Sequence, residues 1–427
     1  MIEEILYARC RQLLPFKMKI KKLLATPGFA GFYFDDLDAI RKGAKMDGMF
    51  YDGAPSTTGF DQIRQRGESI SVLLTLDDGQ VAYGDCVAPQ YSGAGGRDSL
   101  FLTRDQIPII LKDVAPTLVG RELESFRHLA GEVESIEIGG RKLHRAIRYG
   151  VTCAILDAVA RWKKKTMAEV IADEYGTTVS TKPFLASAQS GDDRYSNVDK
   201  MIMKRVDVMP HGLINNLGLL GEKGDRLLEY VKWVRERILT KGEKDFRPII
   251  HIETYGTPGI LFQKNLRRIA EFIERMRETA RPLEFWSEMP IDAGSTEGQI
   301  EAYKELTGIL QDKGIKVKLV ADEWCTTTEE LERFVQQKAA DIIKVKVPEY
   351  GGINKGIEAA LYAKKNKVMT WISESCNSTN KSVECGVHLA LATHADVKAC
   401  APGMGVDEGV ATVYNEMQRV LALAAAG

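Results

Sequence analysis

The chain has 427 residues, of which 44% are hydrophobic and 27% charged, and its formal net charge is −1 at pH 7. These values are ordinary for a globular protein, and the balanced charge excludes the basic surface that nucleic-acid or anionic-membrane binding requires. A length well above roughly 300 residues predicts two domains, because single cores stop growing near that size.

The apolar runs, the first residues and the cysteines indicate the cellular compartment. No apolar run approaches the roughly 20 residues of a membrane span. The first residues carry acids where a secretory signal would carry basic side chains. Seven scattered cysteines without a C-x-x-C pair indicate neither a disulfide framework nor a structural zinc site. We therefore expect a protein of the reducing cytoplasm, without a nucleic-acid or membrane partner.

Residues 1–180 are predicted to form an α+β domain. A strand, an Asp-Gly turn and a second strand occupy residues 68–85, which is the pattern of a hairpin. Helical patterns follow over residues 111–126 and 141–175. The glycine-rich loop 90–98 (QYSGAGGRD) matches no phosphate-binding motif and is expected to be a lid or a turn.

Residues 181–427 are predicted to form a β/α barrel with a C-terminal helix. Short apolar strands alternate with charged amphipathic helices, which implies a parallel sheet. The expected strands are 183–188, 249–253, 284–288, 316–321, 342–347, 368–373 and 397–401, and the expected helices are 224–239, 264–281, 296–312, 328–338, 354–366 and 378–392. A closed TIM-like barrel is favoured over an open sheet, because the chemically useful residues are spread over many strand ends.

Three acids and a lysine close successive strands of this pattern. Glu253, Glu288 and Asp322 each follow an apolar run, and Lys346 ends the next one. Carboxyl ends of barrel strands meet at one mouth, so these groups converge there. Three carboxylates suit a hard divalent cation, and a lysine beside it suits proton abstraction next to a carboxylate. A single such acid is as often a helix cap or surface pair, but three in register favour a site.

Strand alternation adds further inward groups. His251 shares a face with Glu253, and Lys344 with Lys346. Of Asp322 and the following Glu323, only Asp322 is predicted to point inward. Two lysines on one buried face are costly to desolvate, which favours a chemical role. A like charge and a nearby divalent metal both lower a lysine pKa, which leaves a neutral amine able to accept a proton.

Three further positions could contribute polar groups at the barrel mouth. His211 follows an apolar segment, although a lone histidine is more often structural. The stretch 189–193 begins with Gln189 and follows the first barrel strand, and the stretch 375–380 follows a later one. Ser378 could cap a helix and hold an anion. Cys376 lacks a nearby histidine base and is interpreted as a contact residue, not a nucleophile.

Nine motifs resemble those of the methylaspartate ammonia-lyase family, a branch of the enolase superfamily. They are FAGFYFDD (29–36), RQRGESISVLL (64–74), QYSGAGGRD (90–98), HRAIRYG (144–150), AQSGDDRYSNVDKMI (188–202), YVKWVR (230–235), VADEWC (320–325), CNSTNKS (376–382) and PGMGVDEG (402–409). The resemblance begins near Met18, so residues 1–17 are expected to be an extra N-terminal segment that contributes little to the site. It implies a capping domain on a barrel, Mg²⁺ as cofactor, a homodimer and an amino-dicarboxylate substrate.

The resemblance also implies roles for individual residues. The metal ligands fall on Glu253, Glu288 and Asp322, the base on Lys346, and a histidine on the opposite face of the substrate on His211. Substrate contacts fall on Gln90, Gln189, Lys344, Ser375 and Cys376. The chain departs from the family at three of these positions, because Glu253 replaces the usual Asp, Lys344 the usual Gln and Ser375 the usual Thr.

The leading functional hypothesis is a magnesium-dependent carbon–nitrogen lyase. Lys346 would remove a proton from threo-3-methylaspartate, the resulting enolate-like species would be stabilised by the cation, and ammonia would leave to give mesaconate. The Lys344–Lys346 pair keeps an alternative open, namely a cycloisomerase or dehydratase of the same superfamily acting on another carboxylic acid. A Schiff-base barrel enzyme and a non-catalytic relative are the remaining hypotheses.

Overall fold

The computed structural model describes residues 17–93 and 97–426. Apart from Lys17, the predicted extra segment 1–17 lies outside the described residues. Among the helices in the described ranges, none combines the length and the apolar character needed to cross a bilayer. The division of the chain near residue 180 stays a prediction, although the sheets on the two sides of it are separate.

The N-terminal part contains an antiparallel sheet of three strands in the order β1-β4-β5. Its strands are β1 (Ile20–Asp35), β4 (Arg64–Leu76) and β5 (Val81–Cys86). The predicted hairpin is confirmed: Gly79 takes a φ of 87° in the turn, which favours glycine, and Leu76 N donates to Gln80 O at 2.9 Å. The long strand β1 was not predicted, because Pro27 and Gly28 interrupt its apolar pattern.

Helices and two small ribbons make up the rest of this part. They are α2 (Leu37–Arg41), α3 (Thr103–Ile109), η1 (Ile110–Val114), α4 (Ala115–Leu118), α5 (Phe126–Ser135), α6 (Arg145–Lys163) and α7 (Met167–Tyr175), with the small ribbons β2 (Lys45–Asp47) and β3 (Phe50–Asp52), and β6 (Glu137–Ile138) and β7 (Arg141–Lys142). The predicted helix 111–126 is confirmed over 111–118, where η1 and α4 continue α3 without a break, and is wrong beyond Leu118, where the helix ends. The predicted helix 141–175 is broken at Lys164, which is left-handed and ends α6.

The remainder forms a closed barrel of eight parallel strands, which confirms the predicted fold class. The strands are β8 (Leu185–Ser187), β9 (Val208–His211), β10 (Ile249–Glu253), β11 (Phe285–Glu288), β12 (Lys318–Ala321), β13 (Ile342–Lys346), β14 (Met369–Ser373) and β15 (Val397–Ala399). Seven of them match the predicted strands within a few residues. The eighth, β9, was missed because it is short and contains Pro210.

Helices surround the barrel. They are α8 (Arg194–Met203), α9 (Leu217–Leu220), α10 (Asp225–Lys241), α11 (Thr257–Leu261), α12 (Leu266–Ala280), α13 (Thr296–Asp312), α14 (Thr328–Gln336), α15 (Val347–Tyr350), α16 (Ile353–Lys365), α17 (Asn380–Ala392), the turn η2 (Pro402–Met404) and α18 (Val406–Ala426). The predicted cap at Ser378 is wrong: Thr379 caps α17, while Ser378 Oγ donates to Ser375 O at 2.6 Å.

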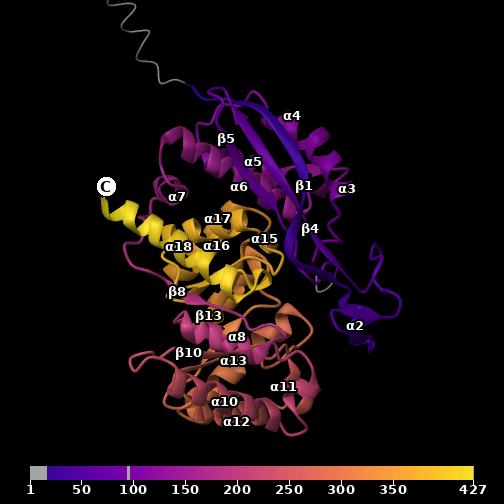
Figure 1. Ribbon diagram of the computed structural model, residues 1–427, viewed down its shortest axis with the longest axis vertical. Helices are drawn as coiled ribbons and strands as arrows, with labels where there is room; N and C mark the ends of the chain where they lie inside the picture. The colour runs from indigo at the N-terminus through magenta and orange to yellow at the C-terminus, as the bar shows by residue number, and fades with distance from the viewer. Residues whose placement is uncertain (1–16, 94–96, 427) are drawn as a thin grey trace, which may run out of the picture.

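Figure 1 shows the N-terminal sheet and its helices at one end of the molecule and the barrel at the other, with α6, α15, α16 and α17 between them. Helix α6 packs directly on β5. Glycine at position 84 allows this close approach, because a Cβ there would overlap the Gly150 carbonyl oxygen. This close packing joins α6 to the sheet, and contacts of α6 with α15 and of β5 with α17 join the capping domain to the barrel helices.

Side chains from alternate strand positions fill the barrel. Its inner cluster consists of Val208, Trp286, Val320, Ile342, Trp371, Val397 and Ala399. Because strand residues alternate, the positions two further along β10, β11, β12 and β13 also point inward and lie nearer the carboxyl ends. The apolar layer therefore forms a floor beneath the polar groups described next.

Candidate active site

The predicted acids and lysines meet at the carboxyl ends of four neighbouring strands. Glu253 ends β10, Glu288 ends β11, Asp322 follows β12, and Lys344 and Lys346 belong to β13. Each has a relative exposure of 5% or less apart from Lys346, whose side chain is 18% exposed. The sequence-based juxtaposition of these five residues is therefore confirmed.

Lys344 lies deepest among them. Its Nζ contacts Glu288 Oε1 and lies 3.5 Å from Asp322 Oδ2. The same nitrogen is 4.8 Å from the centroid of the Trp371 ring, a cation–π distance. Burial lowers the pKa of Lys344, but Glu288 and Asp322 outweigh it and the net direction is upward. Lys344 is thus an ammonium group clamped between two carboxylates.

Lys346 lies nearer the opening. Its Nζ contacts Asp322 Oδ1, and Glu323 and Glu349 carboxylate oxygens lie 3.8 and 4.0 Å away. Burial lowers the pKa of Lys346, but these three carboxylates together raise it well above its ordinary value. Among the protein groups alone, the acids thus outweigh the neighbouring cations, and the lowering of the lysine pKa by a like charge and a bound metal stays a prediction.

The acids crowd one another. Burial, followed by the charges of Glu288 and Glu323, raises the pKa of Glu253 well above its ordinary value. Burial and Glu323 raise the pKa of Asp322 to about 7. Glu288 is shifted the other way, because burial is outweighed by Lys344 and by hydrogen bonds from its neighbours. The prediction that only Asp322 faces the site is wrong, since Glu323 begins a loop that also brings its carboxylate in.

This donor set fits a hard divalent cation. Ligand atoms of His211, Glu253 and Glu288 lie within 4.8 Å of one another, as do those of Glu253, Asp322 and Glu323. Within the described residues, Glu288 Oε2 and Asp322 Oδ1 are buried and make no hydrogen bond of regular geometry, although His251 Nε2 and Lys346 Nζ lie close to them. When all four acids are ionised, the two lysines leave two negative charges in excess. Oxygen donors and an uncompensated double charge are what Mg²⁺ requires.

Two histidines complete the inner wall. His251 Nε2 lies 2.7 Å from Glu288 Oε2, and His211 Nε2 lies 4.0 Å from Glu253 Oε2. Burial lowers the pKa of both, so both are neutral imidazoles at pH 7. His211 ends β9 with a φ of 69°, which breaks the strand alternation and aims its ring toward His251, 5.7 Å away between ring centroids.

The predicted substrate contacts lie around the same opening. Ser375 Oγ donates to Ala88 O at 3.1 Å and so joins the barrel to the capping domain. Cys376 is half-buried, and burial raises the pKa of its thiol to about 11, with Lys346 and Asp322 as charged neighbours. That shift opposes nucleophilic use of Cys376. Gln189 is half-buried two residues beyond β8.

Gln90 is held by a polar cluster of the capping domain. Its Nε2 donates to Asp35 Oδ2 at 2.7 Å, and Arg64 donates to both oxygens of Asp35 at 2.8 and 2.7 Å. The amide of Gln90 is therefore oriented by the ion pair beside it, which leaves its carbonyl oxygen for other partners. The roles assigned to Gln90, Gln189, Ser375 and Cys376 stay predictions.

Sequence reasoning missed two charged residues. Arg97, from the glycine-rich loop, has its Nε 3.3 Å from Glu349 Oε2 and an amino group 3.7 Å from Glu323 Oε1. Its side chain is 8% exposed. Arg97 and Glu349 lie on different domains, and no local pattern in the sequence connects them. His251, by contrast, was predicted from strand alternation to share a face with Glu253.

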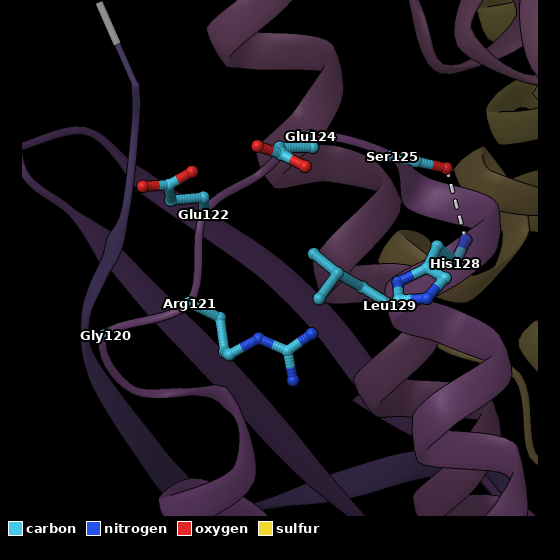
Figure 2. A pocket seen from close by; sticks show the side chains of 7 residues that line it. All are labelled: Gly120, Arg121, Glu122, Glu124, Ser125, His128 and Leu129. Atoms are coloured by element: carbon cyan, nitrogen blue, oxygen red, sulfur yellow. Dashed lines mark hydrogen bonds between the residues drawn. The ribbon is translucent and has the colours of Figure 1, made fainter.

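A separate surface pocket lies on the capping domain (Figure 2). It is lined by Gly120, Arg121, Glu122, Glu124, Ser125, His128 and Leu129. Arg121 pairs with Glu132 at 2.6 Å, and Ser125 Oγ accepts from His128 N as the cap of α5. Its polar groups are thus used within the protein, and it contains none of the predicted site residues.

A closed parallel barrel with acids and lysines at the carboxyl ends of its strands is the arrangement in which β/α-barrel enzymes carry their active sites. The muconate lactonizing enzyme of Pseudomonas fluorescens shares this fold with a TM-score of 0.59 at 14% identity, covering 93% of this chain and 89% of that one.

Comparisons with more similar proteins identify the family. The family models for the methylaspartate ammonia-lyase N-terminus and C-terminus match residues 18–176 and 163–426. The chain belongs to the methylaspartate ammonia-lyase family. It is 50% identical to the methylaspartate ammonia-lyase of Clostridium tetanomorphum over 408 residues, which is 95% of this chain and 99% of that one.

Solved structures of relatives superpose closely. The crystal structure of the Clostridium tetanomorphum beta-methylaspartase magnesium complex gives a TM-score of 0.92 and covers 96% of this chain and 99% of that one. The Citrobacter amalonaticus methylaspartate ammonia-lyase containing (2S,3S)-3-methylaspartic acid gives 0.93 at 43% identity, covering 95% of this chain and 99% of that one.

Proposed function

We propose that this protein is a carbon–nitrogen lyase that eliminates ammonia from threo-3-methylaspartate to give mesaconate. The observation that supports this most is the placement of Lys346 beside buried carboxylates at the barrel mouth in a chain of this family. Proton abstraction next to a carboxylate needs a positioned amine and nearby charged groups that stabilise the negative charge as it develops.

Lys346 is the base in this proposal. It is the more exposed of the two lysines, 18% against 3%, and so the one that a substrate can reach. The charge of Asp322 is the largest cause of the raised pKa of Lys346, and a cation held by Asp322 would offset that charge, so that the neutral amine could take the proton from the carbon bearing the methyl group. The released electron pair forms the carbon–carbon double bond, and the carbon–nitrogen bond of the neighbouring carbon breaks as ammonia leaves.

Glu253, Glu288 and Asp322 hold Mg²⁺ in this proposal, with Glu323 as a nearby fourth acid. The cation, when bound, supplies positive charge for the substrate carboxylate whose negative charge grows as the proton leaves. The raised pKa of Glu253 supports this role, because crowded buried carboxyl groups ionise together only when positive charge is added.

The remaining residues bind and orient the substrate. Gln90, Gln189, Lys344, Ser375 and Cys376 contact its carboxylates and amino group, and neutral His211 lies on the opposite face from Lys346. The rigid hydrogen bonds of Gln90 and Ser375 described above support a positioning role, since an oriented polar group loses little entropy on binding.

The test is ammonia release and the ultraviolet absorbance of the conjugated diacid product, measured on threo-3-methylaspartate with and without Mg²⁺. We expect both signals only with the cation, and neither from Asp322→Ala, which removes a mouth carboxylate but no core packing. Unchanged activity after complete chelation would contradict the metal proposal. Conversion of another carboxylic acid without ammonia release would support a cycloisomerase or dehydratase instead.

The other two hypotheses have separate readouts. A Schiff-base enzyme needs a free amine, whereas both lysines here are paired with carboxylates. Borohydride trapping of a substrate carbonyl on either lysine would revive that hypothesis. A non-catalytic relative would release no ammonia from any amino-dicarboxylate tested.

The proposal extends to assembly and setting. A homodimer in the cytoplasm, acting in amino-acid degradation such as glutamate fermentation, is what the family resemblance supports. Light scattering coupled to size-exclusion chromatography tests the dimer, and a monomer mass at working concentration would contradict it.

A further inference from the structure

Lys344 is the departure from the family pattern with the most direct structural consequence. Its ammonium group contacts Glu288 Oε1 and lies 3.5 Å from Asp322 Oδ2, so it pairs with two of the three acids that are proposed to bind Mg²⁺. The usual glutamine at this position is neutral and offers no such ion pair. The following inference rests on the proposed function, in which these acids are metal ligands.

Every oxygen of these two carboxylates has a polar neighbour in the structure. Glu288 faces Lys344 through Oε1 and lies 2.7 Å from His251 Nε2 through Oε2. Asp322 faces Lys346 through Oδ1 and Lys344 through Oδ2. A divalent cation that binds these oxygens therefore meets a fixed positive charge within a few ångströms, in a buried site where charges are weakly screened.

Lys344 also has a second stabilising neighbour. The face of the Trp371 ring lies 4.8 Å from its Nζ, and a ring face attracts a cation without using a carboxylate oxygen. The ammonium group can therefore shift off Glu288 and Asp322 without losing all its stabilising contacts. A divalent cation can then displace the ammonium group from the two carboxylates.

We propose that Lys344 is a tethered competitor of the divalent cation. It neutralises Glu288 and Asp322 before the cation binds, and it lowers the affinity of the site for that cation. When the cation takes the two carboxylates, the ammonium group is released toward the substrate and becomes available to a substrate carboxylate. Metal and substrate binding are thereby coupled through one side chain.

The test measures Mg²⁺ binding directly, by isothermal titration of chelator-treated protein without substrate. The variants are Lys344→Gln, which restores the family residue, and Lys344→Met, which keeps the apolar stem. Lys318→Gln is the matched control, because Lys318 of β12 also pairs with a glutamate, lying 2.7 Å from Glu284 at the opposite end of the barrel. We expect both Lys344 variants to bind Mg²⁺ about tenfold more tightly or better, and the control to match the wild type.

Thermal unfolding gives a second readout that does not depend on activity. Without Mg²⁺ the Lys344 variants should unfold at a lower temperature than the wild type, because two buried acids lose their partner. Saturating Mg²⁺ should then raise their unfolding temperature by more than it raises that of the wild type, since tighter binding stabilises more. A purely structural lysine would lower both temperatures together.

The outcomes separate this inference from the proposed function. Equal or weaker Mg²⁺ binding by both variants, in an enzyme that releases ammonia with Mg²⁺, would overturn the competition and leave the lyase proposal standing. Absence of Mg²⁺ binding by every variant and by the wild type would overturn both. Tighter binding by the Lys344 variants and not by Lys318→Gln would establish the competition.

Discussion

Replacement of Lys398 by methionine should destabilise the protein in a strongly pH-dependent way. Lys398 and Glu374 form an ion pair with no exposed surface on either side chain, packed against Gly386 of α17. Lys398 Nζ donates to Glu374 Oε2 at 2.6 Å and to Ala399 O at 2.8 Å. The pair lies outside the barrel, because the neighbouring Val397 and Ala399 fill its interior.

The size of the effect follows from the fate of Glu374. Its Oε1 has no hydrogen-bond partner among the described residues, and burial raises its pKa even beside Lys398. Without Lys398 the carboxyl takes a proton in the native state. From an ordinary pKa of 4.5, this costs about 3.4 kcal/mol at pH 7 and about 0.7 kcal/mol at pH 5. The value at pH 7 agrees with the roughly 3–5 kcal/mol expected for a broken buried pair.

The direction of the pH dependence follows from the number of protons that the native and unfolded states bind. In Lys398→Met the native state holds a proton that the unfolded chain releases above pH 4.5, so the stability of the variant falls as pH rises. The assay is urea unfolding followed by circular dichroism at pH 5 and pH 7, compared with the wild type. We expect the loss at pH 7 to exceed the loss at pH 5 by about 2.7 kcal/mol.

Two controls make the reasoning refutable. Lys398→Met combined with Glu374→Gln removes both charges and should recover most of the stability at pH 7. Lys318→Met breaks a half-exposed pair and should change stability by no more than about 0.5 kcal/mol. An equal loss at pH 5 and pH 7 for Lys398→Met would show that Glu374 is not the origin of the cost.

Three further changes test other parts of the structure. Lys346→Ala should lower turnover by several orders of magnitude with an unchanged circular dichroism spectrum, and near-normal ammonia release would remove Lys346 from the role of base. Burial raises the pKa of Glu134 to about 7, so its carboxyl group holds a proton in the native state between pH 4.5 and 7. The free energy of unfolding therefore falls by about 3 kcal/mol as the pH rises across that window. Glu134→Gln should abolish this pH dependence in urea unfolding, and an unaltered dependence would contradict the raised pKa. Arg97→Ala leaves Glu349 without its partner and should lower kcat/KM about tenfold or more at unchanged unfolding temperature, whereas wild-type kinetics would show that this contact between domains does not position the site.

The barrel and its polar mouth were largely predictable from local pattern. Short apolar runs between charged helices predict parallel strands, and a closed barrel places the residues after those runs together. Strand alternation then points Glu253, Glu288, Lys344 and Lys346 inward, and the structure agrees. The prediction was wrong where alternation ends: Glu323 begins a loop, and a loop residue does not follow the rule.

The missed elements share a different cause. The strand β9 is short, and its Pro210 carries no strand signal. His211 reaches the site through a left-handed backbone conformation that side-chain pattern does not predict. The strand β1 is interrupted by glycine and proline, and it is stabilised by pairing with β4 over most of its length. In each case, tertiary contacts outweigh local preference.

The sequence by itself determined the class of fold, the order of the strands and the identity of the acids and lysines at their ends, because these depend on periodicities of a few residues. Only the tertiary structure decided which charges neutralise which. Lys344 bonds to Glu288 across the one intervening strand, β12, and Arg97 of one domain pairs with Glu349 of the other. Electrostatic energy depends on distances in space between charges and on their burial, and neither is encoded in spacing along the chain.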